Sequence, residues 1–117
     1  MEYILLLYGN EGEWAKQTAE TKGQALAEIG KIHGELQAAN KVRGGNALQS
    51  VSTATTVRVR NGKQALTDGP FAETKEQLGG YILIDAQDLN EAIAIAGRLP
   101  SARYGSVEVR PIMKVGR

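Results

Sequence analysis

Apolar residues cluster in two short runs, at residues 3–8 and 80–86, and each run is bounded by glycine or polar residues. A run of this length is typical of a strand buried on both faces. Residues 56–60 instead alternate apolar and polar, which predicts a strand with one exposed face. Asn61-Gly62 follows, the usual dipeptide of a type I′ turn, so residues 63–66 are predicted to return as the second strand of a hairpin arm.

Two segments have the three- and four-residue spacing of amphipathic helices. The first covers residues 24–39, and Asn40 is a suitable residue to end it. Trp14, the only Trp, precedes this helix, where an anchor at the edge of the core is the common role and a ligand contact the rarer one. The second helix begins at Asp88, with Glu91 as its capping-box partner, and ends at Pro100. Its apolar residues spread over a wide arc, which predicts deep burial: Ala92, Ile93, Ile95, Ala96 and Leu99.

The remaining segments complete an alternating order of strands and helices. Residues 44–48 read as a brief strand and residues 49–55 as a loop, while residues 107–110 alternate as a last strand that Pro111 ends or places at a sheet edge. The order β, α, short β, hairpin, β, α, β predicts the α+β class, with a ferredoxin-like βαββαβ plan and an inserted β-hairpin arm. The 117 residues contain no repeat or linker, so we expect a single domain over residues 1–117.

Composition narrows the classes of partner. The chain has 14 Lys and Arg against 13 Asp and Glu, a balance that argues against binding nucleic acid. It has no cysteine, which excludes disulfides and thiolate chemistry and fits the cytoplasm. The first ten residues lack the basic start of a signal peptide, and their apolar run is too short to cross a bilayer. The sequence therefore predicts a small, soluble, cytoplasmic protein with no membrane partner.

Unusual residue types gather at residues 67–81, TDGPFAETKEQLGGY. Asp68-Gly69-Pro70 is turn-forming sequence, because Gly tolerates positive φ, Pro fixes its own φ, and Asp can accept hydrogen bonds from nearby backbone N–H groups. Phe71, the only Phe, follows directly. A rigid turn that holds a ring beside a carboxylate suits a small-molecule site, but a structural corner is the commoner use of such a turn.

The reactive residue types leave proton transfer as the available chemistry. One His, no Cys and no ligand-like spacing of carboxylates predict no metal site, and the absence of a GxGxxG or P-loop pattern predicts no cofactor. Asp68 beside Phe71 would be partly removed from water, a setting in which a carboxylate becomes a useful base. His33 falls at the margin of the apolar stripe of the first helix, where it either bonds a neighbour or carries protons in a pocket under the helix.

Four segments together resemble the DGPF-motif branch of the YCII-related family: GGNALQ, TTVRVRNGK, DGPFAETKEQLGGY and GSVEVRPI. The resemblance extends over residues 3–112 and implies a ferredoxin-like fold that dimerises into an α+β barrel. Relatives of the YCII type have a His/Asp pair proposed as an acid/base site, which implies Asp68 and His33 as its counterparts. Similar barrels include lactone isomerases and dehalogenating lyases that act on small cyclic acids, a likeness of fold.

Three functions follow as hypotheses. The first is a cofactor-free acid/base enzyme, of isomerase or lyase type, acting on a small organic acid, with Asp68 as the base and His33 as acid or orienting group. The second is a non-catalytic ligand-sensing or partner-binding module linked to transcriptional or stress regulation, which the resemblance supports because DGPF proteins are often encoded near alternative sigma factors. The third is a stress or housekeeping protein in which the DGPF turn is a dimer corner.

The enzyme hypothesis assigns further residues to substrate binding. Phe71 and Tyr81 would wall the pocket, and Arg58 or Arg110 would hold the carboxylate of the substrate. We also expect a homodimer, because two helices cover only one face of a sheet whose strands are apolar at successive positions. A second sheet from an identical copy would cover the other face, with Phe71 packed at or across the subunit boundary.

Overall fold

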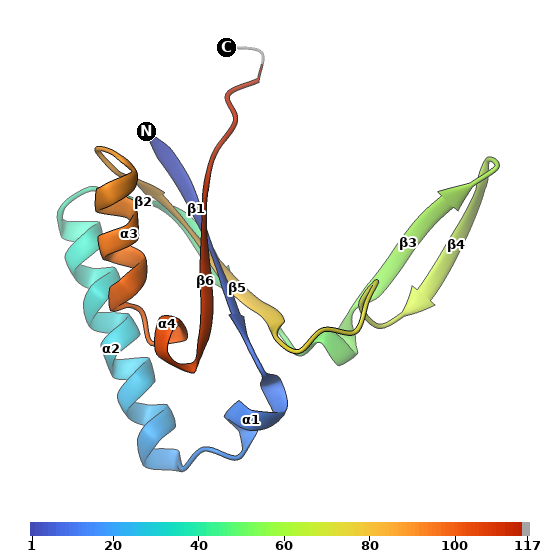
Figure 1. The fold of residues 1–117 in the computed structure, drawn as a ribbon, viewed down its shortest axis with the longest axis horizontal. Helices are drawn as coiled ribbons and strands as arrows, with labels where there is room; N and C mark the ends of the chain where they lie inside the picture. The colour runs from blue at the N-terminus through green and yellow to red at the C-terminus, as the bar shows by residue number, and fades with distance from the viewer. Residues whose placement is uncertain (116–117) are drawn as a thin grey trace.

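The computed structural model describes residues 1–115 and consists of one antiparallel sheet with helices on one face and a projecting hairpin (Figure 1). The sheet has the strand order β2-β5-β1-β6. Its strands are β1 (Glu2–Gly9), β2 (Val42–Ala47), β5 (Gln77–Asp85) and β6 (Gly105–Pro111). Helix α2 (Ala19–Ala38) connects β1 to β2, and α3 (Leu89–Arg98) connects β5 to β6. This order and connectivity confirm the predicted ferredoxin-like α+β fold.

Short helices lie at the lower end of the sheet in Figure 1. Helix α1 (Glu11–Ala15) follows β1, and α4 (Ser101–Tyr104) precedes β6. A 3-10 turn, η1 (Val51–Thr53), leads into the arm, which is formed by β3 (Thr55–Arg60) and β4 (Lys63–Asp68). Residues 51–53 were expected to belong to a loop and no helix was predicted at residues 11–15, because such short helices show no periodic pattern in the sequence.

The core lies between the helices and one face of the sheet. Strand pairing sets Tyr3 opposite Ile84 and Leu5 opposite Ile82, and Tyr3, Leu5 and Ile84 are buried beneath the helices. The helices contribute Ile32, Leu36, Ala92, Ile95, Ala96 and Leu99 to the same cluster. Burial of each large apolar side chain contributes about 1.5–3 kcal/mol, so this face fixes the register of the central strands.

Helix boundaries follow from their caps. The hydroxyl of Thr18 accepts from the backbone N–H of Thr21 at 3.1 Å, so α2 begins at Ala19, five residues before the predicted start. Asn40 ends α2 as predicted, in a left-handed conformation with φ 58°. Asp88 caps α3 by accepting from the N–H of Glu91 at 2.9 Å. The capping box differs from the predicted one, because the Glu91 carboxylate accepts from the N–H of Gln87.

Two predictions of deep burial are wrong for particular residues, one in α3 and one in strand β1. Ile93 is 52% exposed, because α3 turns one side to solvent even though its apolar arc is wide. Strand β1 is central and buries Tyr3 and Leu5, but Ile4 and Leu6 on its other face are only partly buried in the single chain. The outer face of the sheet is therefore apolar and incompletely covered.

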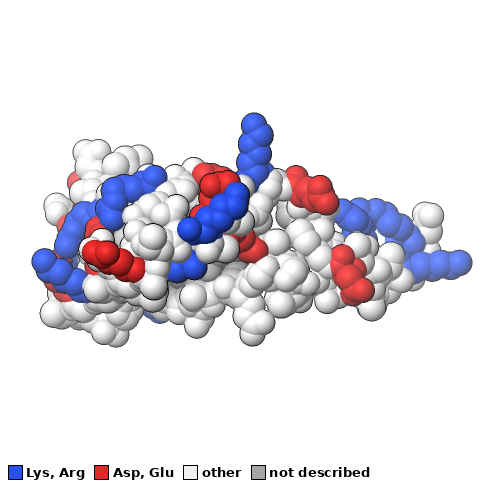
Figure 2. Space-filling view, turned by 90° about the horizontal axis from the view of Figure 1, so that it is seen from below, with Lys and Arg blue, Asp and Glu red and all other residues white. Residues whose placement is uncertain are grey.

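The arm projects away from the body on the side remote from α2 and α3 (Figure 1). Asn61 and Gly62 have φ of 53° and 74°, the positive pair that defines the predicted type I′ turn. Because directly paired residues share a face, Val57, Val59 and Leu66 form an apolar stripe on one side. Arg58, Arg60 and Lys63 lie on the other, and Figure 2 shows Lys and Arg gathered along this part of the molecule.

Candidate functional site

A cavity of about 880 Å³ lies between the first half of α2 and the sheet. Leu26, Ile29 and His33 of α2 line one wall, and β2 and β5 line the opposite wall with residues that include Gly45 and Gly80. The short helices α1 and α4 close one end. The volume lies in the range of small-molecule sites in proteins.

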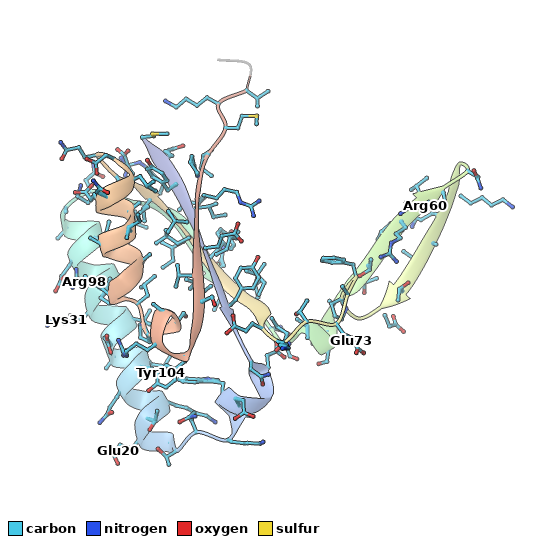
Figure 3. All side chains as sticks on the ribbon, in the orientation of Figure 1. Glu20, Lys31, Arg60, Glu73, Arg98 and Tyr104 are labelled. Carbon is cyan, nitrogen blue, oxygen red and sulfur yellow. The ribbon has the colours of Figure 1, made fainter. Side chains whose placement is uncertain are left out.

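Two aromatic rings meet at the closed end of the cavity. Trp14 of α1 and Tyr104 of α4 have ring centroids 5.3 Å apart with an interplanar angle of 66°, an edge-to-face contact. Figure 3 shows Tyr104 beside α4, between α2 and α1. Arg103 donates to both carboxylate oxygens of Glu28 in α2, at 3.0 and 2.7 Å, and this hydrogen bonding lowers the pKa of Glu28. Helices α1, α2 and α4 are therefore joined around the cavity.

Polar side chains fix the position of α1 at the root of the arm. The Glu11 carboxylate accepts from the hydroxyl of Ser50 at 2.7 Å and from the N–H of Val51 at 3.1 Å. Its own backbone N–H donates to Gln77 Oε1 at 3.0 Å. The cavity wall and the arm root thus share Glu11, which is itself one of the lining residues.

Glycines without side chains line the sheet side of the cavity. Neighbouring strands lie so close together there that a Cβ atom would not fit. A Cβ at Gly105 would lie 2.1 Å from the carbonyl oxygen of Tyr8. Gly45 has φ +156°, and a Cβ there would lie 2.7 Å from the carbonyl oxygen of Tyr81. Both positions are structural requirements for glycine, and both border the cavity.

The structure brings two of the six predicted site residues to this cavity. His33 lines the wall, at the margin of the buried stripe of α2, with its side chain exposed. Tyr81 borders it at β5, where its hydroxyl accepts from Asn46 Nδ2 at 3.1 Å. Strand pairing places the Tyr81 side chain with Leu6 and Asn46, on the face away from α2 and α3.

Three of the predicted residues lie together at the base of the arm. Asp68 ends β4 opposite Thr55 and is exposed, and Phe71 is 76% exposed. Arg58 donates to the carbonyl oxygen of Phe71 at 3.4 Å. None of the three lines the cavity of the same chain. A single chain therefore does not bring Asp68 to His33.

The Asp-Gly-Pro turn is held by its neighbours. The N–H of Gly69 donates to the carbonyl oxygen of Ala54 at 2.6 Å, and the hydroxyl of Thr56 donates to the carbonyl oxygen of Gly69 at 2.8 Å. Gly69 has φ +101°, the conformation that favours glycine. Within residues 1–115 the Asp68 carboxylate accepts no hydrogen bond, so the expected side-chain support for the turn comes from Thr56 instead.

Arg110, the sixth predicted residue, lies near the end of the edge strand β6; the first residue of this strand, Gly105, borders the cavity, but Arg110 does not. Its Nε donates to Glu108 at 2.8 Å, and this pairing raises the pKa of Arg110. Among residues 1–115, no group of three His, Cys, Asp or Glu side chains is placed to hold a metal ion. The chemistry at the cavity rests on its aromatic rings, His33 and the α1 carboxylates.

Sequence reasoning missed most of the cavity. Trp14 was interpreted chiefly as an anchor, and it both packs on Tyr104 and lines the cavity. The only signal in the sequence for this end of the cavity was the presence of two aromatic residues, Trp14 and Tyr104. Their contact could not be predicted, because it depends on the whole fold. Leu26 was placed in the apolar stripe of α2, yet it is 67% exposed at the cavity wall.

A family model and a relative each match nearly the whole chain. The model of the YCII-related domain matches residues 1–115. Uncharacterized protein R00369 of Rhizobium meliloti (strain 1021) is 35% identical over 114 residues, which cover 96% of this chain and 92% of that protein. In the part of the chain that the structure describes, no helix has the length and hydropathy needed to span a membrane.

Proposed function

We propose that this chain, which belongs to the YCII-related family, binds a small molecule in the cavity beneath the first half of α2. One observation carries the proposal: about 880 Å³ of space has a mainly apolar lining surface that includes an aromatic pair and an exposed leucine. Cavities of this size and composition are the usual sites of small ligands. Leu26 in particular is an apolar side chain that a ligand would remove from water.

His33 places an imidazole at the cavity wall, a side chain of the kind used in acid/base chemistry. A binding protein would use it as a hydrogen-bond donor or acceptor, which supports the ligand-sensing function. An enzyme needs a second acid/base group at the same place. The single chain offers Glu11 and Glu13 there, and Glu11 is already held by Ser50 and Val51.

Acid/base catalysis on a small organic acid is the second candidate, and it requires a second copy of the chain. Asp68 lies on the arm, and its carboxylate is not engaged within residues 1–115. In a homodimer the arm of one copy would bring Asp68 and Phe71 toward the cavity of the other, where Asp68 would act as base opposite His33. Arg58 lies beside Phe71 on the same arm and would hold the carboxylate of the substrate.

Homodimerisation is proposed on two observations. The outer face of the sheet pairs Ile4 with Leu83 and Leu6 with Tyr81, an apolar surface that the helices leave uncovered. The arm is a two-stranded hairpin with an exposed apolar stripe, and such a hairpin is marginally stable in water by itself. A second copy related by two-fold symmetry would cover both surfaces at once.

A thermal-shift screen of small ring compounds, both acids and amines, tests the binding function. A ligand of the native state raises the melting temperature by an amount that grows with the logarithm of its concentration relative to its dissociation constant. We expect hits whose effect is lost in Leu26→Ser, which removes the apolar side chain from the cavity wall, and kept in Leu89→Ser, at an exposed leucine on α3. Equal loss in both variants, or no hit at all, would contradict the proposal. Conversion of a hit, abolished by Asp68→Asn, would support the enzyme.

A further inference from the structure

Apart from the imidazole of His33, the acidic and basic side chains that line the cavity are carboxylates. Glu11 and Glu13 of α1 line it, and no Lys or Arg does so within residues 1–115. Lys16 pairs with Glu13 at 3.6 Å and Lys22 donates to the carbonyl oxygen of Ala15 at 3.2 Å, but both lie outside the lining. The two arginines assigned to hold a carboxylate, Arg58 and Arg110, lie on the arm and on the far edge strand.

An anionic ligand would lose hydration in this cavity without gaining an ammonium or guanidinium partner from the lining. Removing a carboxylate from water is costly unless a cation or several hydrogen-bond donors replace the water. The lining offers uncharged donors such as Asn10 and Gln17, but the charge that it fixes is negative, since the Glu11 carboxylate is held at the wall by Ser50 and Val51. Its position is fixed before any ligand arrives, so a cation would meet a preorganised negative charge.

The aromatic pair favours the same charge. Trp14 and Tyr104 stand edge to face at the closed end of the cavity, so their contact covers a face of only one of the two rings. A ring face is the negative pole of its quadrupole and attracts cations, and Trp is the strongest such partner. The structure already contains one cation–π contact at this place, because the guanidinium carbon of Arg103 lies 6.0 Å from the Tyr104 ring centroid.

From these observations we infer that the cavity selects a planar, ring-bearing amine, cationic at neutral pH, and disfavours the matching carboxylate. The ring would lie along Leu26 and Ile29 and against the bare glycine-lined strands, and the ammonium group would lie toward α1. This inference rests on the proposed binding function and replaces the organic acid suggested by the family resemblance with a ligand of opposite charge.

Three probes with one ring and different charges test the inference: tryptamine, 3-methylindole and indole-3-acetate. Isothermal titration calorimetry on the full chain measures each affinity. We expect tryptamine to bind on the order of tenfold more tightly than indole-3-acetate, with 3-methylindole between them. The preference should shrink in Glu13→Gln and in Glu11→Gln, whose amide oxygen can still accept from Ser50. It should persist in Glu73→Gln, because Glu73 lies at the root of the arm and not at the cavity (Figure 3).

The possible outcomes distinguish a failure of the inferred charge preference from a failure of the proposed binding function. Tighter binding of indole-3-acetate, or a tryptamine preference unchanged in both α1 variants, would overturn the inference and leave a binding cavity in place. If none of the three probes binds but other ring compounds give hits that depend on Leu26, the inference fails alone. If no compound binds in a Leu26-dependent way, the proposed function fails as well.

Discussion

The ring of Trp14 meets the ring of Tyr104 edge to face, with centroids 5.3 Å apart, and so joins α1 to α4 at the closed end of the cavity. The two residues are 90 positions apart in the sequence and belong to helices of five and four residues. Neither helix is long enough to be stable by itself. The aromatic contact therefore contributes both to holding these helices and to shaping the cavity.

Replacing Tyr104 tests the contribution of its ring. Tyr104→Phe keeps the edge-to-face contact and should change the free energy of unfolding by less than about 0.5 kcal/mol, while Tyr104→Ala should cost about 1 kcal/mol or more. Urea melts of the two variants measure the difference. Equal losses would show that the hydroxyl, and not the ring, is the stabilising group.

The Glu91 carboxylate makes the stability of the fold depend on pH in the acidic range. Its pKa is lowered, first by the hydrogen bond from the N–H of Gln87 and then by Lys41, whose Nζ lies 2.9 Å from the carboxylate. The folded state therefore holds this proton less tightly than the unfolded state. The resulting stabilisation is complete above the ordinary glutamate pKa and is lost as the pH falls through the lowered value.

Glu91→Gln should flatten this acid-dependent loss, because the amide oxygen still accepts from Gln87 but does not titrate. Thermal melts between about pH 6 and about pH 3 measure the slope of stability against pH. Glu73→Gln is the matched control, since Glu73 forms no salt bridge within residues 1–115. Parallel curves for parent and Glu91→Gln would contradict the assignment.

The sequence predicted the fold closely at positions where a turn or helix end depends on residues that are neighbours in the chain. Asn61-Gly62 supplied the two positive φ angles of its turn, and Asn40 supplied the left-handed residue that ends α2. The start of α2 was missed because its apolar pattern begins later than its cap at Thr18. In each case the deciding interaction lies within a few residues of the chain.

The candidate site could not be predicted in the same way. The cavity depends on how far the first half of α2 stands from β5, a tertiary distance that no periodic pattern encodes. His33 was predicted at the margin of the helical stripe, and its side chain is exposed there at the wall of the cavity. Its pairing with Asp68 came from family resemblance, and the two residues lie on different parts of the single chain.

Asp68 should be nearly neutral for stability. The turn depends on Gly69, Ala54 and Thr56, so Asp68→Asn and Asp68→Ala should each change the free energy of unfolding by less than about 1 kcal/mol. Thr56→Val removes the hydroxyl that donates to Gly69 and should cost about 1 kcal/mol. Denaturant melts compare the three. A large loss in Asp68→Ala alone would mean that the carboxylate holds the turn through a contact formed in an assembly.

Phe71 should contribute to association between copies. Burial of this exposed ring would contribute about 1.5–3 kcal/mol, so Phe71→Ala should weaken dimerisation by roughly tenfold or more. Light scattering over a micromolar concentration series measures the dissociation constant, with Leu89→Ala as the control for an exposed apolar residue elsewhere. A monomeric mass for the parent at these concentrations, or equal behaviour of both variants, would contradict a role for the arm in dimerisation.

The most direct test of the binding cavity uses its single tryptophan. Trp14 is the only Trp in the chain, so one indole N–H signal in an ¹H–¹⁵N correlation spectrum reports on the cavity wall. Titration with a thermal-shift hit should move that signal saturably, together with the amide signals of Leu26 and Gly80, and leave Val59 and Gly62 of the arm unchanged. An indole signal that stays fixed while arm signals move would show that the ligand binds elsewhere and that the cavity is not the functional site.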